Sequence, residues 1–434
     1  MNPENDQSCG WINALPPRIN IKTLKGEHRS DWIVVGAGLT GLSAARQLGI
    51  LNPNQKIILI DAQLAGEGAS SRNSGYLVNS TLNDGFVSNK ELTGYKEKTD
   101  LYGLGIKSVK DFIKTYQVKC DWNECGKYYA SSQVKDINRL VKFGKILSSL
   151  NVEHQVLYRE DLKKRLGTNF YYASIYTKND ILINPAKLSR SMVDSLPENV
   201  KLFENSKLIK WNKRGKLIDC KFEDGKVLSS KIIFCTNGFL RDLGIKTNYS
   251  FPLLLSASMS RQLTDEEFIS IGKPQEWGVL SVKPMGATVR MTKDRRILIR
   301  NTAEVSNQSI MKSKNLNKRI QLHSKGIKKR FPTLPDNIIE SSWTGVACRS
   351  GNAAQIFDKI DDNIFAVGCF NGSGIGLGTL FGEQIAYKAC NQITNEMISI
   401  EKNKKPNWLP PEPFLSWGVR ARLFRDRILA KSDS

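Results

Sequence analysis

The sequence predicts a mixed α/β fold, in which a parallel sheet covered by helices is joined to a second, antiparallel α+β domain. Three observations lead to this prediction. Residues 31–61 contain an apolar run, a glycine motif, a helical pattern and a second apolar run, in that order. A second glycine-rich turn lies at residues 372–376, far along the chain. Between the two, residues 250–264 and 278–301 have the character of antiparallel strands.

Each part of residues 31–61 has a physical role in a dinucleotide site. Trp32–Val35 is continuously apolar, as in a parallel strand buried on both faces. In the motif that follows, Gly36 permits a tight turn, Gly38 lets the backbone approach a pyrophosphate, and Gly41 lets the helix pack closely on the strand. The start of the helix offers unpaired N–H groups to phosphate, and Asp61 ends the second strand where a carboxylate can bond ribose hydroxyls. This order predicts a Rossmann-type dinucleotide site.

Length and composition limit the number of domains and the class of protein. The chain has 434 residues, enough for two or three domains, and its 40% hydrophobic and 24% charged content is that of a globular protein. No signal peptide or membrane span is expected, and the eight scattered cysteines form no C-x-x-C pair, which favours reduced thiols and a cytoplasmic location. Three histidines make a His-based metal cluster implausible, so no metal is expected.

The net charge of +22 has two interpretations. It could attract an anionic partner such as nucleic acid or a membrane surface. Alternatively, it reflects a lysine-rich composition that only solvates the surface. Because the lysines are spread along the chain, with one basic block at Lys325–Arg330, the second interpretation is favoured.

Composition and pattern also divide the chain into expected regions. Helical spacing runs from 89 to about 150, interrupted by Trp122 and Tyr128-Tyr129, and residues 200–209 read as one strand. The terminal helix is basic and amphipathic; it could touch a partner or a membrane, but packing against its own domain is favoured. The expected regions are an extended leader (1–30), a discontinuous dinucleotide-binding domain (31–88, 179–245 and 335–400), a substrate or cap domain (89–178 and 246–334), and a Pro-rich linker with a basic C-terminal helix (401–434).

Three further stretches are expected beside the dinucleotide crevice. The loop Gly66–Gly75 is rich in glycine and hydroxyl groups suited to contact phosphate or a flat ring, with Arg72 as a fixed positive charge. Thr236–Gly238 follows a buried strand, at the strand end where open α/β sheets bind ligands. The turn at Gly372–Gly376 is interpreted as a second phosphate- or ring-binding turn, with close packing of a glycine-rich helix as the alternative.

Together these motifs resemble the D-amino-acid-oxidase-like FAD oxidoreductases over nearly the full chain. Gly68–Gly75 is similar to the G-A-S-x-R-N-x-G loop of the gamma-glutamylputrescine-oxidoreductase-like branch, Cys235–Gly238 resembles the A-T-N-G turn, and Gly372–Gly376 resembles the C-terminal segment near the flavin. The resemblance implies FAD as cofactor. Its expected contacts are Gly36, Ala37, Gly38, Thr40, Gly41, Asp61, Ala62, Ser70, Ser71, Arg72, Asn73, Ser74, Gly75, Leu208, Thr236, Asn237, Gly238, Gly372, Ser373, Gly374, Ile375 and Gly376.

The chain also departs from this family. Arg300-Asn301 stands where members often have a glycine pair, and after Trp343-Thr344-Gly345 the positive residue is shifted to Arg349 while an expected acid is absent. These departures leave the FAD assignment intact but do not identify the substrate.

The resemblance implies oxidation of a C–N bond. A small-molecule amine or amino acid would transfer hydride to flavin N5, the imine would hydrolyse, and oxygen or another acceptor would reoxidise the flavin. No catalytic acid or base is assigned. Arg72, Arg300 and Arg349 are candidates for binding a substrate carboxylate, with a structural salt bridge as the alternative for each. Cys348 and Cys369 stand in plausible places for covalent flavin attachment, although buried free cysteine is the commoner state.

Two other functions remain open at this point. One wobble-uridine modification family uses a domain of this superfamily, and a basic chain suits an RNA partner, so an FAD-dependent tRNA-modifying enzyme is one alternative. The other is an FAD-binding module without catalysis.

Overall fold

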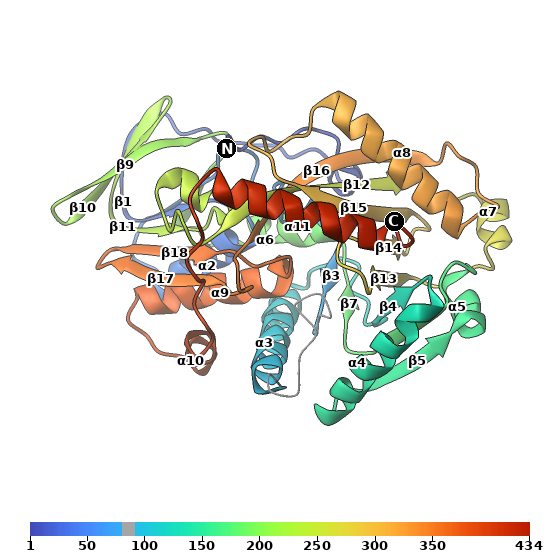
Figure 1. The fold of residues 1–434 in the computed structure, drawn as a ribbon. Coiled ribbons are helices and arrows are strands. Elements are labelled where there is room, and N and C mark those ends of the chain that lie inside the picture. Colours follow the sequence, from blue (N-terminus) through green and yellow to red (C-terminus); the bar gives the residue numbers. More distant parts are fainter. Residues whose placement is uncertain (80–91) are drawn as a thin grey trace.

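The computed structural model describes residues 1–79 and 92–434, so the expected domain boundary at 88/89 and the expected start of the first helical region lie outside the described residues. The predicted fold class is confirmed, because two large sheets of different character make up the molecule (Figure 1). Among the described residues no helix is long and apolar enough to cross a membrane. All eight cysteines are free thiols.

The first sheet is built around β1, which begins at Gly26 and ends at Val35 just before the glycine motif. β1 pairs in parallel with β2 and β11, and the path continues in parallel to β8 and β18. β17 and the β9–β10 hairpin add antiparallel strands. The bounds are β2 Ile57–Ile60, β8 Val200–Phe203, β9 Leu208–Arg214, β10 Leu217–Phe222, β11 Gly225–Phe234, β17 Ile356–Asp361 and β18 Ile364–Gly368.

Helices on one face of this sheet meet through glycines. α2 (Leu39–Leu51) and α9 (Gly374–Ala389) cross so closely that a Cβ on Gly382 would lie 2.3 Å from the Thr40 carbonyl oxygen. α3 (Leu92–Tyr116) meets α9 at Gly105 and Gly376, where a Cβ on Gly105 would lie 2.8 Å from the Gly376 carbonyl carbon. Close packing of a glycine-rich helix, given above as an alternative, therefore describes the glycines inside α9.

The second sheet has the order β16-β12-β15-β14-β13-β4-β6-β5 and is antiparallel except for the β13–β4 pair. Its strands come from three regions of the sequence. β16 pairs with β12 along its whole length, so the 335–400 segment contributes to both sheets. The bounds are β4 Lys127–Ser131, β5 His154–Tyr158, β6 Ala173–Thr177, β12 Phe251–Ser260, β13 Trp277–Ser281, β14 Thr288–Met291, β15 Ile297–Glu304 and β16 Ile339–Arg349.

A small sheet and several helices complete the fold. β3 pairs with β7, and α4 packs on β5 and β6 of the second sheet. α8 lies along the strands β12, β15 and β16. The bounds are β3 Tyr76–Leu77, β7 Ile181–Leu182, α1 Gly10–Asn13, α4 Ile137–Ser149, α5 Arg159–Leu166, α6 Pro185–Asp194, α7 Asp265–Ser270, α8 Ser313–Arg330, α10 Asn395–Glu401 and α11 Phe414–Ala430.

Two local expectations were wrong. The region predicted as helical up to residue 150 contains β4, because Tyr128 and Tyr129 belong to a strand between β13 and β6 rather than to an interruption within helix. The strand predicted over 200–209 is two strands, β8 and β9, because the chain turns at Asn205, whose φ is 49°. Asparagine tolerates this left-handed conformation, which ends β-pairing.

Both chain ends are tied to the body of the molecule. The leader, expected to be extended, buries Cys9 and Trp11 and places its terminal amine 2.7 Å from Asp242 Oδ1. α11 packs its Leu423 with Leu253 of β12 and with Ala303. The expectation that the C-terminal helix packs against its own domain is therefore confirmed for one face of the helix.

His323 of α8 gives a pH-dependent contribution to stability. The side chain is buried, and its Nδ1 lies 2.7 Å from Ser258 Oγ. Burial, followed by repulsion from Arg319 and Arg300, lowers the pKa of His323 from 6.5 to about 3. The native state therefore holds it neutral, while the unfolded chain takes up a proton as the pH falls below 6.5.

We expect this residue to reduce the free energy of unfolding by about 1.4 kcal/mol for each pH unit below 6.5. Denaturant unfolding of the wild type and of His323→Gln, whose amide can still bond Ser258, should be compared from pH 6.5 to 5. The wild type should lose more stability across this interval. If the free energy of unfolding depends on pH in the same way for the two proteins, His323 is not the residue responsible.

Candidate functional site

One cavity of about 1230 Å³ lies between the two sheets. The carboxyl ends of β1, β2 and β11 open into it through Gly36, Asp61 and Thr236, and the turn after β18 reaches it through Asn371. Residues of β12, β15 and β16 in the second sheet form the facing wall. Ligands of open α/β sheets bind outside the carboxyl ends of the strands, so the cavity lies where the fold places a ligand.

The glycine motif forms the dinucleotide end of this cavity. Gly36 has φ +98°, and a Cβ there would lie 2.9 Å from the Cys235 carbonyl oxygen. A Cβ on Gly41 would lie 1.7 Å from the Gly36 carbonyl oxygen, which no side chain can do. Gly38 caps the start of α2 and lines the cavity together with Leu39 and Thr40, so the N-terminal end of this helix lies at the cavity wall.

Asp61 lies beside this turn. Its Oδ2 accepts a hydrogen bond from the Ala37 N–H (2.7 Å) and its Oδ1 accepts one from the Gln63 N–H (2.9 Å). Burial raises the pKa of Asp61 to about 6, against the lowering effect of these backbone hydrogen bonds. A carboxylate held in this way, next to the phosphate-binding turn, can still accept hydrogen bonds from ribose hydroxyls.

The Gly66–Gly75 loop is fixed by its own hydrogen bonds. Ser70 Oγ accepts from the Leu39 N–H at the start of α2 (2.9 Å), and the Ser71 hydroxyl donates to the Gly66 carbonyl (2.6 Å). Asn73 Oδ1 accepts from the Gly75 N–H (2.8 Å). The loop is therefore a rigid wall of the cavity rather than a flexible surface segment.

Arg72 has a structural role in this loop. Its guanidinium donates to Asp6 Oδ1 (2.8 Å), to the Thr344 carbonyl (3.1 Å) and to the Glu67 carbonyl (3.0 Å). These contacts join the leader, the loop and β16. Because its donors are occupied, we do not retain Arg72 as a ligand of a substrate carboxylate; the structural salt bridge, given as the alternative, describes it.

The second glycine turn faces the same cavity. Gly372 has φ +102° with open space where a Cβ would stand, and Gly374 and Ile375 begin α9 at the cavity wall. The Cys369 N–H donates to Asn237 Oδ1 (2.9 Å), so the turn after β18 is bonded to the turn after β11. Thr236 Oγ1 is buried without a hydrogen-bond partner among the described residues, an orphaned polar group that a bound ligand would satisfy.

The cavity therefore collects most, but not all, of the residues expected to contact a cofactor. Five of them do not line it: Ala37, Gly41, Ser71, Gly75 and Gly376. Those that line it are Gly36, Gly38, Thr40, Asp61, Ala62, Ser70, Arg72, Asn73, Ser74, Leu208, Thr236, Asn237, Gly238, Gly372, Ser373, Gly374 and Ile375. Cys348 also lines it, whereas Cys369 does not.

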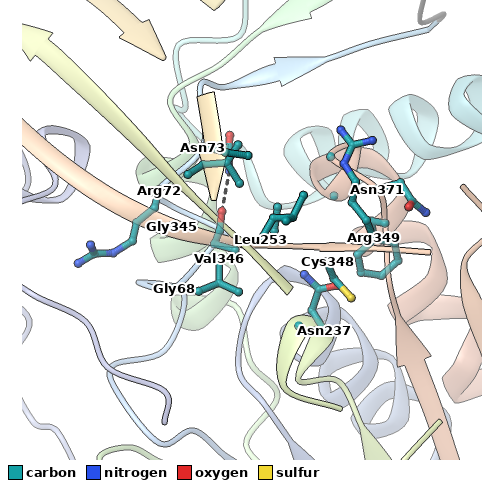
Figure 2. A pocket seen from close by; sticks show the side chains of 18 of the residues that line it. Gly68, Arg72, Asn73, Asn237, Leu253, Gly345, Val346, Cys348, Arg349 and Asn371 are labelled. Carbon is teal, nitrogen blue, oxygen red and sulfur yellow. Dashed lines mark hydrogen bonds between the residues drawn. The ribbon is translucent and has the colours of Figure 1, made fainter. Parts of the chain in front are cut away.

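Arg300 of β15 and Arg349 of β16 also line the cavity, and Arg349 lies beside the second glycine turn, because the Ser350 N–H donates to Asn371 Oδ1 (2.9 Å). Arg300 Nη2 donates to Thr288 Oγ1 (2.7 Å), and neither arginine has a carboxylate partner among the described residues. Burial, followed by repulsion from Arg349, lowers the pKa of Arg300 to about 10, which leaves it charged at neutral pH. In Figure 2, Arg349 and Arg72 lie on opposite sides of the pocket. Arg300 is partly buried, whereas Arg349 is exposed to solvent.

Sequence reasoning missed several parts of the cavity wall. The start of the leader and one face of α11 line it, as do inward-facing residues of β12. Along β12, Phe251, Leu253, Leu255 and Ala257 line the cavity at the two-residue spacing of a strand, with Ser256 in addition, and this spacing is a usable signal. Nothing in the sequence shows that the two chain ends reach the site. The missed lining residues include Met1, Glu4, Tyr76, Leu253, Leu255, Ala257, Thr288, Trp343, Leu415, Val419 and Leu423.

FAD fits these residues. Both glycine turns line the same cavity, and their glycines remove the side chains that would block a pyrophosphate. Asp61 and the orphaned Thr236 hydroxyl supply polar partners. The fold and the site together define a dinucleotide-binding flavoprotein oxidoreductase.

Comparison with known proteins supports this class of protein. The family model described as DAO, FAD dependent oxidoreductase, matches residues 31–388, so the chain belongs to this family and is an FAD-dependent oxidoreductase. A probable oxidoreductase OrdL of Haemophilus influenzae is 24% identical over 396 residues, covering 86% of this chain and 84% of that protein. The gamma-glutamylputrescine oxidoreductase of Escherichia coli is 23% identical over 370 residues, covering 84% of each. The crystal structure of glycine oxidase from Geobacillus kaustophilus superposes with a TM-score of 0.70 at 14% identity, covering 85% of this chain and 96% of that one.

We expect Asp61→Ala to weaken FAD binding roughly 10- to 100-fold, the value of a charge-assisted hydrogen bond. Ribose hydroxyls favour the charged carboxylate, so wild-type affinity should also fall as the pH drops through about 6, and the variant should lack this dependence. Fluorescence titration of apoprotein with FAD measures both effects.

Asp31→Ala is the matched control. Asp31 also accepts a backbone hydrogen bond, from the Lys56 N–H (2.8 Å), but it does not line the cavity. Equal loss of affinity in the two variants would show that Asp61 acts only through the fold.

Proposed function

We propose that the protein oxidises the C–N bond of an amine or amino acid that carries a carboxylate group. The observation that supports this most directly is the pair of guanidinium groups, Arg300 and Arg349, on the cavity wall without an acidic partner among the described residues. The two guanidinium groups repel each other across the cavity, and this repulsion contributes to the lowered pKa of Arg300. A substrate carboxylate supplies the missing charge and can bind a guanidinium through two oxygens.

The second sheet shapes the substrate side of the cavity. Thr288 accepts from Arg300 and holds its guanidinium in one orientation (2.7 Å). Apolar side chains of β12, Leu253 and Leu255, line the same wall and exclude water from the reacting C–N bond. Burial raises the pKa of Tyr76, which therefore remains a neutral hydroxyl that donates to the Val289 carbonyl (2.9 Å). Tyr76 is thus part of the wall and does not act as a base.

FAD, when bound, would supply the redox chemistry as the acceptor of a hydride from the carbon next to the amine nitrogen. In the proposed arrangement the cavity-lining residues named above hold FAD, and the two arginines hold the substrate carboxylate, so that the amine carbon is oriented against the cofactor. The imine released then hydrolyses in water. We propose oxygen or another small acceptor for reoxidation, and the cytoplasm as the place of the reaction.

Known relatives support the substrate class. Glycine oxidase and gamma-glutamylputrescine oxidoreductase are named for an amino acid and for an amine derivative, respectively. Neither name identifies the substrate of this chain, because Arg300-Asn301 and the Arg349 segment are the places where it departs from the family pattern.

We expect Arg300→Met and Arg349→Met to raise KM for the best carboxylate-bearing substrate roughly 10- to 100-fold each, with a smaller change in kcat, because they remove ground-state binding. The measurement is anaerobic bleaching of the flavin by a panel of amino acids, gamma-glutamyl amines and the corresponding amines without a carboxylate. Only the carboxylate-bearing compounds should lose affinity in the variants.

Other results of the same bleaching assay distinguish the alternative functions. If no compound of the panel reduces the flavin while a chemical reductant does, the protein is an FAD-binding module or acts on a macromolecule. Wild-type preference for amines without a carboxylate would overturn the role of the two arginines.

A further inference from the structure

The C-terminal helix α11 has two apolar sides, and only one of them is used inside the protein. Leu415, Leu423 and Ala430 are buried against the body of the molecule. A second apolar row runs along the helix at intervals of three and four residues and is exposed to solvent; Trp417 and Phe424 of this row are 59% and 66% exposed. The row consists of Phe414, Trp417, Ala421, Phe424 and Ile428.

Arginines stand on both sides of this row. At 100° per residue, Arg420 and Arg427 fall on one side of it and Arg422 and Arg425 on the other. The single acid of the helix, Asp426, is buried and is shared by Arg425 (3.0 Å) and Arg422 (3.8 Å). The outward side of α11 is therefore an apolar stripe with a cationic border and no exposed acid.

A basic groove adjoins the stripe. It lies between α11 and α8, has a volume of about 610 Å³, and is lined by Lys318, Arg319, Arg420 and Arg427, with Phe424 beside them and Glu304 as the one acid. α8 contains seven lysines and arginines and no Asp or Glu. Both helices lie on the same side of the molecule, with α11 in red and α8 in orange (Figure 1). The fold thus brings Lys318 and Arg319 of α8 beside Arg420 and Arg427 of α11, which are distant in the sequence.

We propose that this α8–α11 surface, meaning the apolar row of α11 together with the groove, docks the protein on a bilayer containing anionic phospholipid. Trp417, Phe424 and Ile428 enter the boundary between headgroups and acyl chains. The flanking arginines and Lys318 reach lipid phosphates while their stems cover apolar surface. The association is peripheral, since no helix among the described residues could cross the bilayer.

The same features argue against other occupants. A second copy of the chain would bring a like net charge of +22 against this surface. A single-stranded nucleic acid stacks its bases on aromatic rings interleaved with cations, whereas this row also contains Ala421 and Ile428, which have no ring, and its cations stand outside the row. A continuous apolar line bordered by cations matches a flat anionic interface.

The test is cosedimentation of the full-length, FAD-loaded protein with vesicles of phosphatidylcholine alone or with one third phosphatidylglycerol. Binding should require phosphatidylglycerol and weaken with salt. The double variant Trp417→Ser/Phe424→Ser, which alters exposed residues that do not line the flavin cavity, should bind roughly 10- to 100-fold less because two large apolar side chains no longer insert. Arg420→Gln/Lys318→Gln should lose about 25-fold.

The matched control is Tyr158→Ser/Ile393→Ser, which removes two other exposed apolar side chains, 49% and 78% exposed, outside this surface. It should bind vesicles as the wild type does, and the flavin spectrum should be unchanged in every variant. Vesicle binding that survives Trp417→Ser/Phe424→Ser would overturn the proposal, as would no binding at all. A dimer, or a complex with tRNA, that the same double variant abolishes would assign the surface to that occupant instead.

Discussion

The contact between α2 and α9 is the constraint on which the rest of this structure depends. Gly382 and Gly378 lie against Thr40 so closely that any side chain would push the helices apart. Because α2 follows the first glycine turn and α9 follows the second, this contact holds two turns that are more than three hundred residues apart at one cavity. Glycines inside α9 thus act on the cofactor site indirectly, through the separation of the helix axes.

The two sheets contribute different chemical groups to that cavity. The parallel sheet offers glycine turns, helix starts and the carboxylate of Asp61, groups that suit phosphates and ribose. The antiparallel sheet offers an apolar wall with Arg300 and Arg349, groups that suit a small anion beside an apolar carbon skeleton. A ligand with a nucleotide at one end and a redox ring at the other can contact both sheets, and this is why a long dinucleotide suits the cavity better than a mononucleotide.

The ends of the chain connect the site to the surface. Met1 and Leu415 both line the cavity, and Arg72 ties the leader to β16 through Asp6. α11 is placed between the cavity on one side and solvent on another, so the helix that closes the site also carries the exposed apolar row. A surface helix that buries one face gains its stability from that face, which leaves the composition of the other free to serve binding.

The sequence by itself determined the parallel sheet, the first glycine turn and the cofactor class, because those features depend on local order: strand, turn, helix, strand and acid within thirty residues. It did not reveal β4, because a short apolar stretch has no period that distinguishes strand from helix. It did not separate β8 from β9, because the turn between them depends on the left-handed backbone conformation of Asn205, which the apolar pattern does not mark. Only the tertiary structure decided which of the three candidate arginines lack an acidic partner among the described residues and are available to bind a substrate carboxylate. Arg72, Arg300 and Arg349 have the same side chain, yet Asp6, in the leader, occupies Arg72 alone. Charge partners come from distant parts of the chain, and folding rather than local pattern brings them together.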